Sequence, residues 1–205
     1  LHLCDRRQRQ MCIRDRIYSE LTYSGKHCSI AEIEGMRERT IVINGFSKSF
    51  AMTGWRLGFL GGPKEIVSQM LKLHQYAIMS SPTVSQYAAI VAMHSCQKDI
   101  DAMRNEYNIR RRFVVDSFNK LGLKCFAPQG AFYVFPCIKS TGMTSTDFCE
   151  KLVYTKKVAV VPGDAFGECG EGYVRVSYAY SLNHLREAIK RIGEFLEDIK
   201  NGNVQ

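Results

Sequence analysis

The sequence contains no pair of cysteines separated by two residues, although it has eight cysteines among its 205 residues. Its five histidines do not stand beside these cysteines at the spacing of a zinc site, so we expect no metal centre. A chain of this length does not need a disulfide framework to fold. The cysteines are therefore interpreted as the reduced thiols of a cytoplasmic protein.

Long apolar runs are also missing. No stretch of 18 apolar residues occurs, so no membrane span is expected, and the arginine-rich beginning lacks the apolar segment of a secretory signal. Hydrophobic residues make up 45% and charged residues 23% of the chain, which is typical of a globular protein and not of a disordered or collagen-like one.

The charge is unbalanced, with 28 lysines and arginines against 20 acidic residues and a net charge of +8. Residues 1–16 have neither helical nor strand periodicity, hold five of the arginines and begin with Leu1, so we interpret them as a non-native leader joined to a fragment. The alternative is a basic arm that binds nucleic acid. The moderate charge of the remainder suits a pocket for anionic small molecules, and we expect no nucleic-acid partner.

From residue 17 onward, short apolar runs indicate strands. Residues 17–23 (IYSELTY) have strand character, and residues 40–45 (TIVING) form a nearly continuous apolar run, as in a parallel sheet covered on both faces. Residues 56–63 (RLGFLGGP) are predicted to contain a second short strand. Farther along, strands are expected at residues 124–128, 130–136, 158–163 and 173–180.

Helical periodicity is clearest in four longer stretches and one shorter one. Residues 64–79 place Ile66, Met70, Leu73 and Ala77 on one stripe, which predicts an amphipathic helix. The other helices are expected at residues 83–96, 98–121, 146–155 and 182–199, with Gly122 as the C-cap of the longest.

This order of elements predicts an α/β protein with two lobes and no internal repeat. Residues 17–110 are expected to form part of a large domain with a mixed, mostly parallel sheet. Residues 111–205 are expected to form a smaller α+β domain, with the boundary inside the long helix.

Lys48 lies in a turn of small residues directly after the apolar run 40–45, where α/β proteins place ligands. A neutral lysine amine can attack a carbonyl group, and Arg56 carries a charge that never titrates away and suits a phosphate. A phosphate ester with a carbonyl group would satisfy both side chains. Pyridoxal phosphate fits this description.

Residues 47–58 (SKSFAMTGWRLG) resemble the lysine signature of the class I/II aminotransferases, which are fold type I pyridoxal-phosphate enzymes. The resemblance extends from about Ile17 to about Ile199. It is supported by residues 80–89 (SSPTVSQYAA), 130–136 (GAFYVFP) and 160–179 (VVPGDAFGECGEGYVRVSYA). It implies a C-terminal fragment of such an enzyme.

The resemblance implies roles for residues around the lysine. Lys48 would form the internal aldimine with pyridoxal 5′-phosphate and then move the proton between the substrate Cα and the cofactor. Arg56 would bind the cofactor phosphate, with the Ser47 hydroxyl as a helper. The family often has a phosphate-binding serine three residues before the lysine, where this sequence has Gly45.

The resemblance also assigns roles farther from the lysine. Tyr18 would hydrogen-bond to the cofactor O3′, and Asp15 stands where the family has the aspartate that pairs with the pyridine nitrogen, although Arg16 replaces the usual glutamate. Arg175 would bind the substrate α-carboxylate in a two-pronged ion pair. Tyr133 is interpreted as a packing residue.

The implied reaction moves an α-amino group between an amino acid and a 2-oxo acid, with 2-oxoglutarate expected, in a homodimer when the protein is full length. The fragment alone is expected to be a poor catalyst. Two alternatives stay open: another chemistry on the same scaffold, such as a carbon–sulfur β-lyase or a decarboxylase, and the effector-sensing domain of a transcription regulator, which would need a helix-turn-helix upstream.

Overall fold

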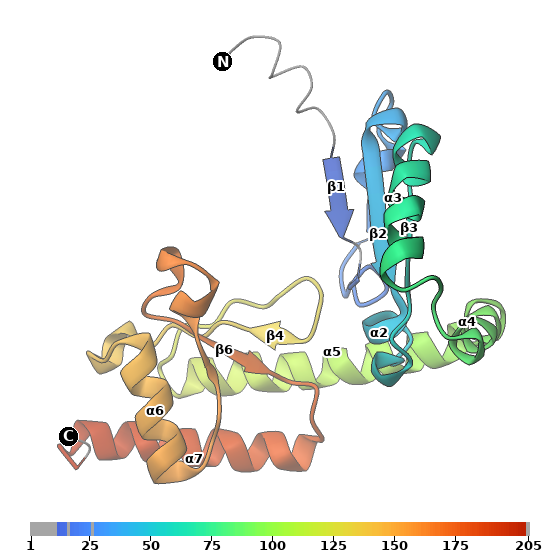
Figure 1. Ribbon diagram of the computed structural model, residues 1–205. Coiled ribbons are helices and arrows are strands. Elements are labelled where there is room, and N and C mark those ends of the chain that lie inside the picture. The colour runs from blue at the N-terminus through green and yellow to red at the C-terminus, as the bar shows by residue number, and fades with distance from the viewer. Residues whose placement is uncertain (1–11, 16, 26, 204–205) are drawn as a thin grey trace, which may run out of the picture. The chain divides into compact units, whose positions relative to one another are not determined.

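The structure, a computed structural model, describes residues 12–15, 17–25 and 27–203 (Figure 1). The chain divides into two compact units, Leu1–Arg104 and Asn105–Gln205. The predicted boundary at residues 110 and 111 and the observed division both fall within one helix, α5 (Gln97–Lys120). Among the described residues, no helix is long and apolar enough to cross a membrane.

The first unit contains a three-stranded sheet in the order β1, β2, β3. The middle strand β2 pairs in parallel with β1 and antiparallel with β3. The parallel pair agrees with the prediction for residues 40–45, but β2 is not covered on both faces, because Ile43 is 36% exposed. The strands are β1 (Cys12–Asp15), β2 (Thr40–Gly45) and β3 (Gly58–Gly61).

Two strand predictions near the start of the chain were wrong. Residues 12–15 form β1, although the pattern of residues 1–16 predicted no strand. Residues 17–20 form a turn, in which the Leu21 N–H donates to the Tyr18 carbonyl at 3.0 Å, so the expected strand at residues 17–23 is absent there.

Helix α3 (Lys64–Ala77) runs beside β2 and β3 (Figure 1). A pocket of about 560 Å³ is lined by residues of all three elements. The helix was predicted correctly, but its apolar stripe only in part: Ile66 and Met70 are half-buried, whereas Leu73 is 73% exposed and Ala77 is also exposed. The residues that line the pocket include Val67, Met70 and His74. The face toward the sheet is therefore rotated from the predicted stripe.

The buried core of the first unit includes residues on both sides of Lys48 in the sequence. Phe46, Met52, Ala89 and Ala92 form a buried apolar cluster, and α4 (Thr83–Ser95) supplies the two alanines. The remaining short elements of this unit are η1 (Ile30–Glu32), η2 (Arg37–Arg39), α2 (Phe46–Ser49) and η3 (Thr53–Trp55).

The second unit contains a small antiparallel sheet in the order β4, β6, β5, with helices α6 and α7. The predicted strand at residues 124–128 is absent, and the other three shrink to two to four residues. The elements are β4 (Tyr133–Val134), η4 (Lys139–Thr141), α6 (Ser145–Lys156), β5 (Val161–Pro162), η5 (Gly163–Phe166), η6 (Glu168–Gly170), β6 (Val174–Ser177) and α7 (Leu182–Lys200).

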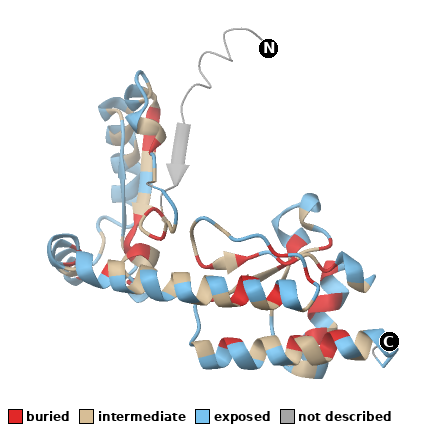
Figure 2. Ribbon diagram, turned by 180° about the vertical axis from the view of Figure 1, so that it is seen from behind, coloured by how far each residue is buried: buried red, intermediate tan, exposed pale blue. Residues whose placement is uncertain are grey.

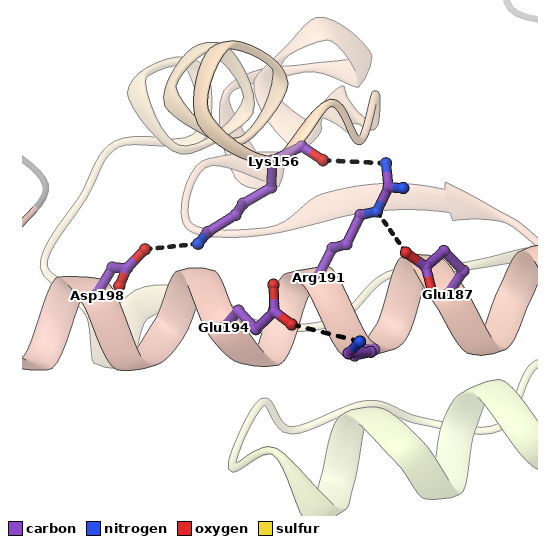
Figure 3. A network of polar contacts seen from close by, with 6 residues as sticks. Lys156, Glu187, Arg191, Glu194 and Asp198 are labelled. Atoms are coloured by element: carbon purple, nitrogen blue, oxygen red, sulfur yellow. Dashed lines mark hydrogen bonds and ion pairs between the residues drawn. The ribbon is translucent and has the colours of Figure 1, made fainter.

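Apolar packing joins α6 to α7, and polar contacts surround it. The rings of Phe148 and Phe195 meet edge to face with centroids 5.2 Å apart, and both are buried. Figure 2 shows buried segments on both helices. The Lys156 ammonium lies 2.7 Å from the Asp198 carboxylate, and Arg191 donates to the Lys156 carbonyl at the end of α6 (Figure 3). Ion pairs at the surface contribute about 0–1 kcal/mol, and the Lys156–Asp198 pair is half-buried at the rim of this contact, so the buried rings stabilise it more than the charges.

Two cysteines of the second unit are buried, and this changes their acidity. Burial raises the pKa of the Cys125 thiol to about 11. Burial, together with the Asp164 carboxylate, raises the pKa of the Cys149 thiol to about 12. The stability of the fold is therefore undiminished by these thiols below pH 9.0, the ordinary thiol value, and falls as the pH rises toward 11 or 12, because the thiols of the unfolded chain ionise first.

Alkylation of the native protein should therefore separate buried from exposed thiols. At about pH 9 we expect Cys28 and Cys169, which are exposed, to react roughly 50-fold or more faster than Cys125 and Cys149. Time-resolved labelling with iodoacetamide and peptide mass spectrometry measures the individual rates, and urea-unfolded protein provides the control. Equal rates for Cys28 and Cys149 in the native protein would contradict the buried position of Cys149.

Candidate active site

Lys48 lies on a single helical turn that begins where β2 ends. Gly45 closes the strand as the N-cap, and Phe46–Ser49 forms α2. Phe46 and Ser49 are buried, whereas Ser47 and Lys48 are half-buried. The chain turns here because the Phe46 carbonyl accepts hydrogen bonds from the N–H groups of both Phe50 and Met52, at 3.2 Å each.

The segment that carries Tyr18 contacts this turn. The Ser49 hydroxyl donates to the Ile17 carbonyl at 3.2 Å, across 32 positions of sequence. A side chain on Gly45 would place its Cβ 2.8 Å from Cδ1 of Ile17. Gly45, which departs from the serine of the family pattern, therefore leaves the room that Ile17 occupies beside α2.

Arg56 follows η3 in the left-handed region, with φ 50° and ψ 47°. Its guanidinium Nη1 donates to the Thr53 carbonyl at 3.1 Å. The next residue, Leu57, accepts a hydrogen bond from the Phe46 N–H at 3.2 Å, which brings the Arg56 backbone to the start of α2. The buried Ser85 of α4 donates to the Trp55 carbonyl at 2.8 Å and fixes the same segment from the other side.

Asp15 ends β1 opposite Ile43 of β2, and the two strands are parallel. The carboxyl ends of parallel strands meet at one edge of a sheet, which is where α/β proteins bind ligands. The backbone therefore places Asp15 at the same edge as the turn that carries Lys48. The segments of Asp15, Tyr18, Lys48 and Arg56 are all gathered there.

The side chains of this edge suit an anionic aldehyde. Lys48 supplies an amine, Arg56 a fixed cation and Ser47 a hydroxyl, the groups that a phosphate ester with a carbonyl would contact. A neighbouring pocket of about 460 Å³ does not suit a phosphate, because its lining, which includes Phe50, Met52 and Val91, is mainly apolar and contains neither Lys48 nor Arg56. The donor set thus fits pyridoxal phosphate. No cluster of metal-ligating side chains occurs in the part of the chain that the structure describes.

Arg175 belongs to the second unit, on β6, where it is half-buried. Its guanidinium carbon lies 4.6 Å from the centroid of the Tyr133 ring and 4.5 Å from that of the Phe166 ring. Within the described residues, the guanidinium makes no hydrogen bond and no ion pair with another side chain. Its N–H groups are thus available for an anion.

Sequence patterns did not reveal the two serines that hold the site together. The hydroxyls of Ser49 and Ser85 donate hydrogen bonds to carbonyl groups that are 32 and 30 positions away in sequence. Both are buried polar residues, 1% and 5% exposed, and buried hydroxyls need hydrogen-bond partners. The only available signal was their position inside the motifs SKS and SSPTVSQYAA.

The chain resembles known aminotransferases over nearly its whole length. The family described as aminotransferase class I and II matches residues 1–192. An aspartate aminotransferase of Pyrococcus abyssi is 48% identical over 191 residues, which are 92% of this chain and 49% of that protein. Aromatic-amino-acid aminotransferase 2 of Thermococcus litoralis is 46% identical over 193 residues, 93% of this chain and 50% of that protein.

Solved structures agree with the sequence relatives. The crystal structure of an aromatic aminotransferase from Pyrococcus horikoshii superimposes with a TM-score of 0.90 and 46% identity, over 93% of this chain and 52% of that one. The chain spans about half the length of the curated relatives it matches. This confirms the predicted resemblance and the predicted fold type I scaffold, and the chain belongs to the class I and II aminotransferases.

Proposed function

We propose that the protein is a pyridoxal-phosphate-dependent aminotransferase that moves an α-amino group between an amino acid and a 2-oxo acid, with 2-oxoglutarate as an acceptor. The observation that carries this proposal is the gathering of the Asp15, Tyr18, Lys48 and Arg56 segments at one edge of the β1–β2 pair. The relatives of the chain are named aminotransferases, and they do not favour the lyase or the regulator alternative.

Each site residue would have a separate task. Pyridoxal phosphate, when bound, supplies an electron sink that makes the substrate Cα proton acidic. The Lys48 amine, which would hold the cofactor between turnovers, would take that proton and return it. Arg56 and Ser47 would bind the phosphate, the Tyr18 hydroxyl would donate to O3′, and Asp15 would keep the pyridine nitrogen protonated.

Arg175 would bind the α-carboxylate of the substrate. Its planar guanidinium can donate two parallel hydrogen bonds to the two carboxylate oxygens, which fixes the direction of the substrate as well as its charge. Lysine cannot reproduce this geometry.

The whole protein is proposed to be longer than this chain and to act as a cytoplasmic homodimer. The length of the relatives supports a longer protein. The six cysteines for which side chains are described are unpaired thiols, which supports the cytoplasmic location. The 205 residues alone are proposed to be a poor catalyst.

Covalent labelling tests the cofactor site directly. After incubation with pyridoxal phosphate and reduction with borohydride, we expect peptide mass spectrometry to find the label on Lys48 at low cofactor concentration. Arg56→Leu should raise the half-saturating concentration about 10- to 100-fold, because a charge-assisted contact to the phosphate is lost. Arg37→Leu, which removes an exposed arginine of the same unit, should leave it unchanged. Label spread evenly over the exposed lysines would refute the proposed site.

A further inference from the structure

We propose that Tyr133 and Phe166, here called the aromatic pair, position the Arg175 guanidinium so that two of its N–H groups can donate to the two oxygens of one carboxylate. This inference rests on the proposed role of Arg175 in substrate binding. It assigns a positioning task to Tyr133, which the sequence indicated only as a packing residue, and to Phe166, for which the sequence indicated no task.

The strand register brings Tyr133 to Arg175. Tyr133 on β4 lies opposite Ser177 on β6, and Arg175 is two residues from Ser177 on the same strand. Residues two apart on a strand point to the same face, and a ring can reach such a diagonal neighbour. The guanidinium carbon is accordingly 4.6 Å from the ring centroid of Tyr133.

Phe166 comes from a different element. It ends η5 and lies 4.5 Å from the guanidinium carbon, measured to its ring centroid. Its ring and that of Phe135 pack edge to face, with centroids 5.8 Å apart and planes at 77°. The backbone of its loop is fixed from both ends, because the Gly163 N–H donates to the Tyr173 carbonyl and the Gly170 N–H donates to the Gly167 carbonyl, at 2.9 and 2.8 Å.

The pair matters because a free arginine side chain has many rotamers. Rings that lie over the guanidinium attract its charge through their π faces and restrict the side chain to fewer orientations. A carboxylate binds a guanidinium in the plane of its N–H groups, and within the described residues no hydrogen bond or ion pair occupies these groups of Arg175. The guanidinium also makes no hydrogen bond with another described residue, so the rings are its observed restraint.

Protection from an arginine reagent tests this inference without any need for activity or cofactor. The 205-residue chain is treated with phenylglyoxal at increasing succinate concentration, and peptide mass spectrometry measures modification of Arg175. We expect succinate to protect Arg175, and its dimethyl ester not to. Tyr133→Leu and Phe166→Leu should each raise the half-protecting concentration about 3- to 30-fold.

Conservative replacements separate positioning from general packing. Tyr133→Phe and Phe166→Tyr keep the ring faces and should retain protection close to that of the unmodified chain. Tyr154→Leu, which removes an exposed tyrosine of the same unit, should also have no effect. Phe166 is 50% exposed, so its leucine variant should fold even if the Tyr133 variant does not, and circular dichroism checks both.

The outcomes distinguish the two proposals. If succinate does not protect Arg175 in the unmodified chain, the carboxylate-binding role fails, and the positioning inference fails with it. If the unmodified chain is protected and both leucine variants retain the same half-protecting concentration, only the role of the aromatic pair is refuted.

Discussion

Lys48→Ala should lower the rate of transamination by the protein about 10²- to 10⁴-fold or more, while substrate binding changes little. The amine is the group proposed both to hold the cofactor aldehyde and to move the Cα proton, and no neighbouring side chain on α2 could replace it, since Phe46 and Ser49 are buried and Ser47 has no basic group. The measurement uses a full-length protein, in which this chain is joined to the half that is present in its relatives. Single-turnover absorbance changes with an amino acid and 2-oxoglutarate report the chemical step.

Two control variants show whether the loss arises from the amine at this position. Lys48→Arg keeps a positive charge but cannot release its proton, so it should be as inactive as the alanine variant. Lys64→Ala removes an exposed lysine at the start of α3 and should retain full activity. A Lys48→Ala protein that still transaminates within tenfold of the unmodified enzyme would refute the assignment.

Gly163→Ala should strongly destabilise the second unit. An added Cβ would lie 2.2 Å from the Gly170 carbonyl oxygen and 2.7 Å from the Tyr173 carbonyl oxygen, and both obstacles are backbone atoms that cannot rotate away. Overpacking of this kind costs about 1–3 kcal/mol or more. In a unit of this size each kcal/mol lowers the melting temperature by about 4–8 °C.

Gly193→Ala provides the matched control for this substitution. Gly193 lies within α7, and its added Cβ would meet only the flexible end of Leu121 at 3.2 Å. Alanine is preferred to glycine inside a helix by about 0.5–1 kcal/mol, so this variant should melt at the same or a higher temperature. Thermal unfolding followed by circular dichroism compares the two, and equal melting temperatures would show that the loop accommodates the methyl group.

Local signals predicted the long helices well. The predicted helices at residues 98–121, 146–155 and 182–199 correspond to α5, α6 and α7, each displaced by at most one residue at either end. Their ends carry sequence signals: Gly122, with φ 82°, follows α5, and the hydroxyl of Ser181 caps α7. Helical periodicity and caps depend on neighbouring residues, which is why a single sequence contains them.

Features that depend on distant residues were not predictable in the same way. The turn at residues 17–20 reads as a strand from its composition, and the orientation of α3 follows from the position of β2 and β3 rather than from its own pattern. The positions of Lys48 and Arg56 were predicted from their motif, whereas the serine hydroxyls that connect them to the rest of the site span about 30 positions. The aromatic contacts of Arg175 likewise require the strand register.

The backbone conformation of Arg56 links the stability of the first unit to the proposed contact with the cofactor phosphate. A left-handed conformation costs a residue with a Cβ atom about 1–2 kcal/mol, and Arg56 adopts it at φ 50°. Glycine at this position would relieve that strain and remove the guanidinium at the same time. If Arg56 binds the cofactor phosphate as proposed, selection for heat tolerance and selection for vitamin B6 chemistry would therefore act on this position in opposite directions.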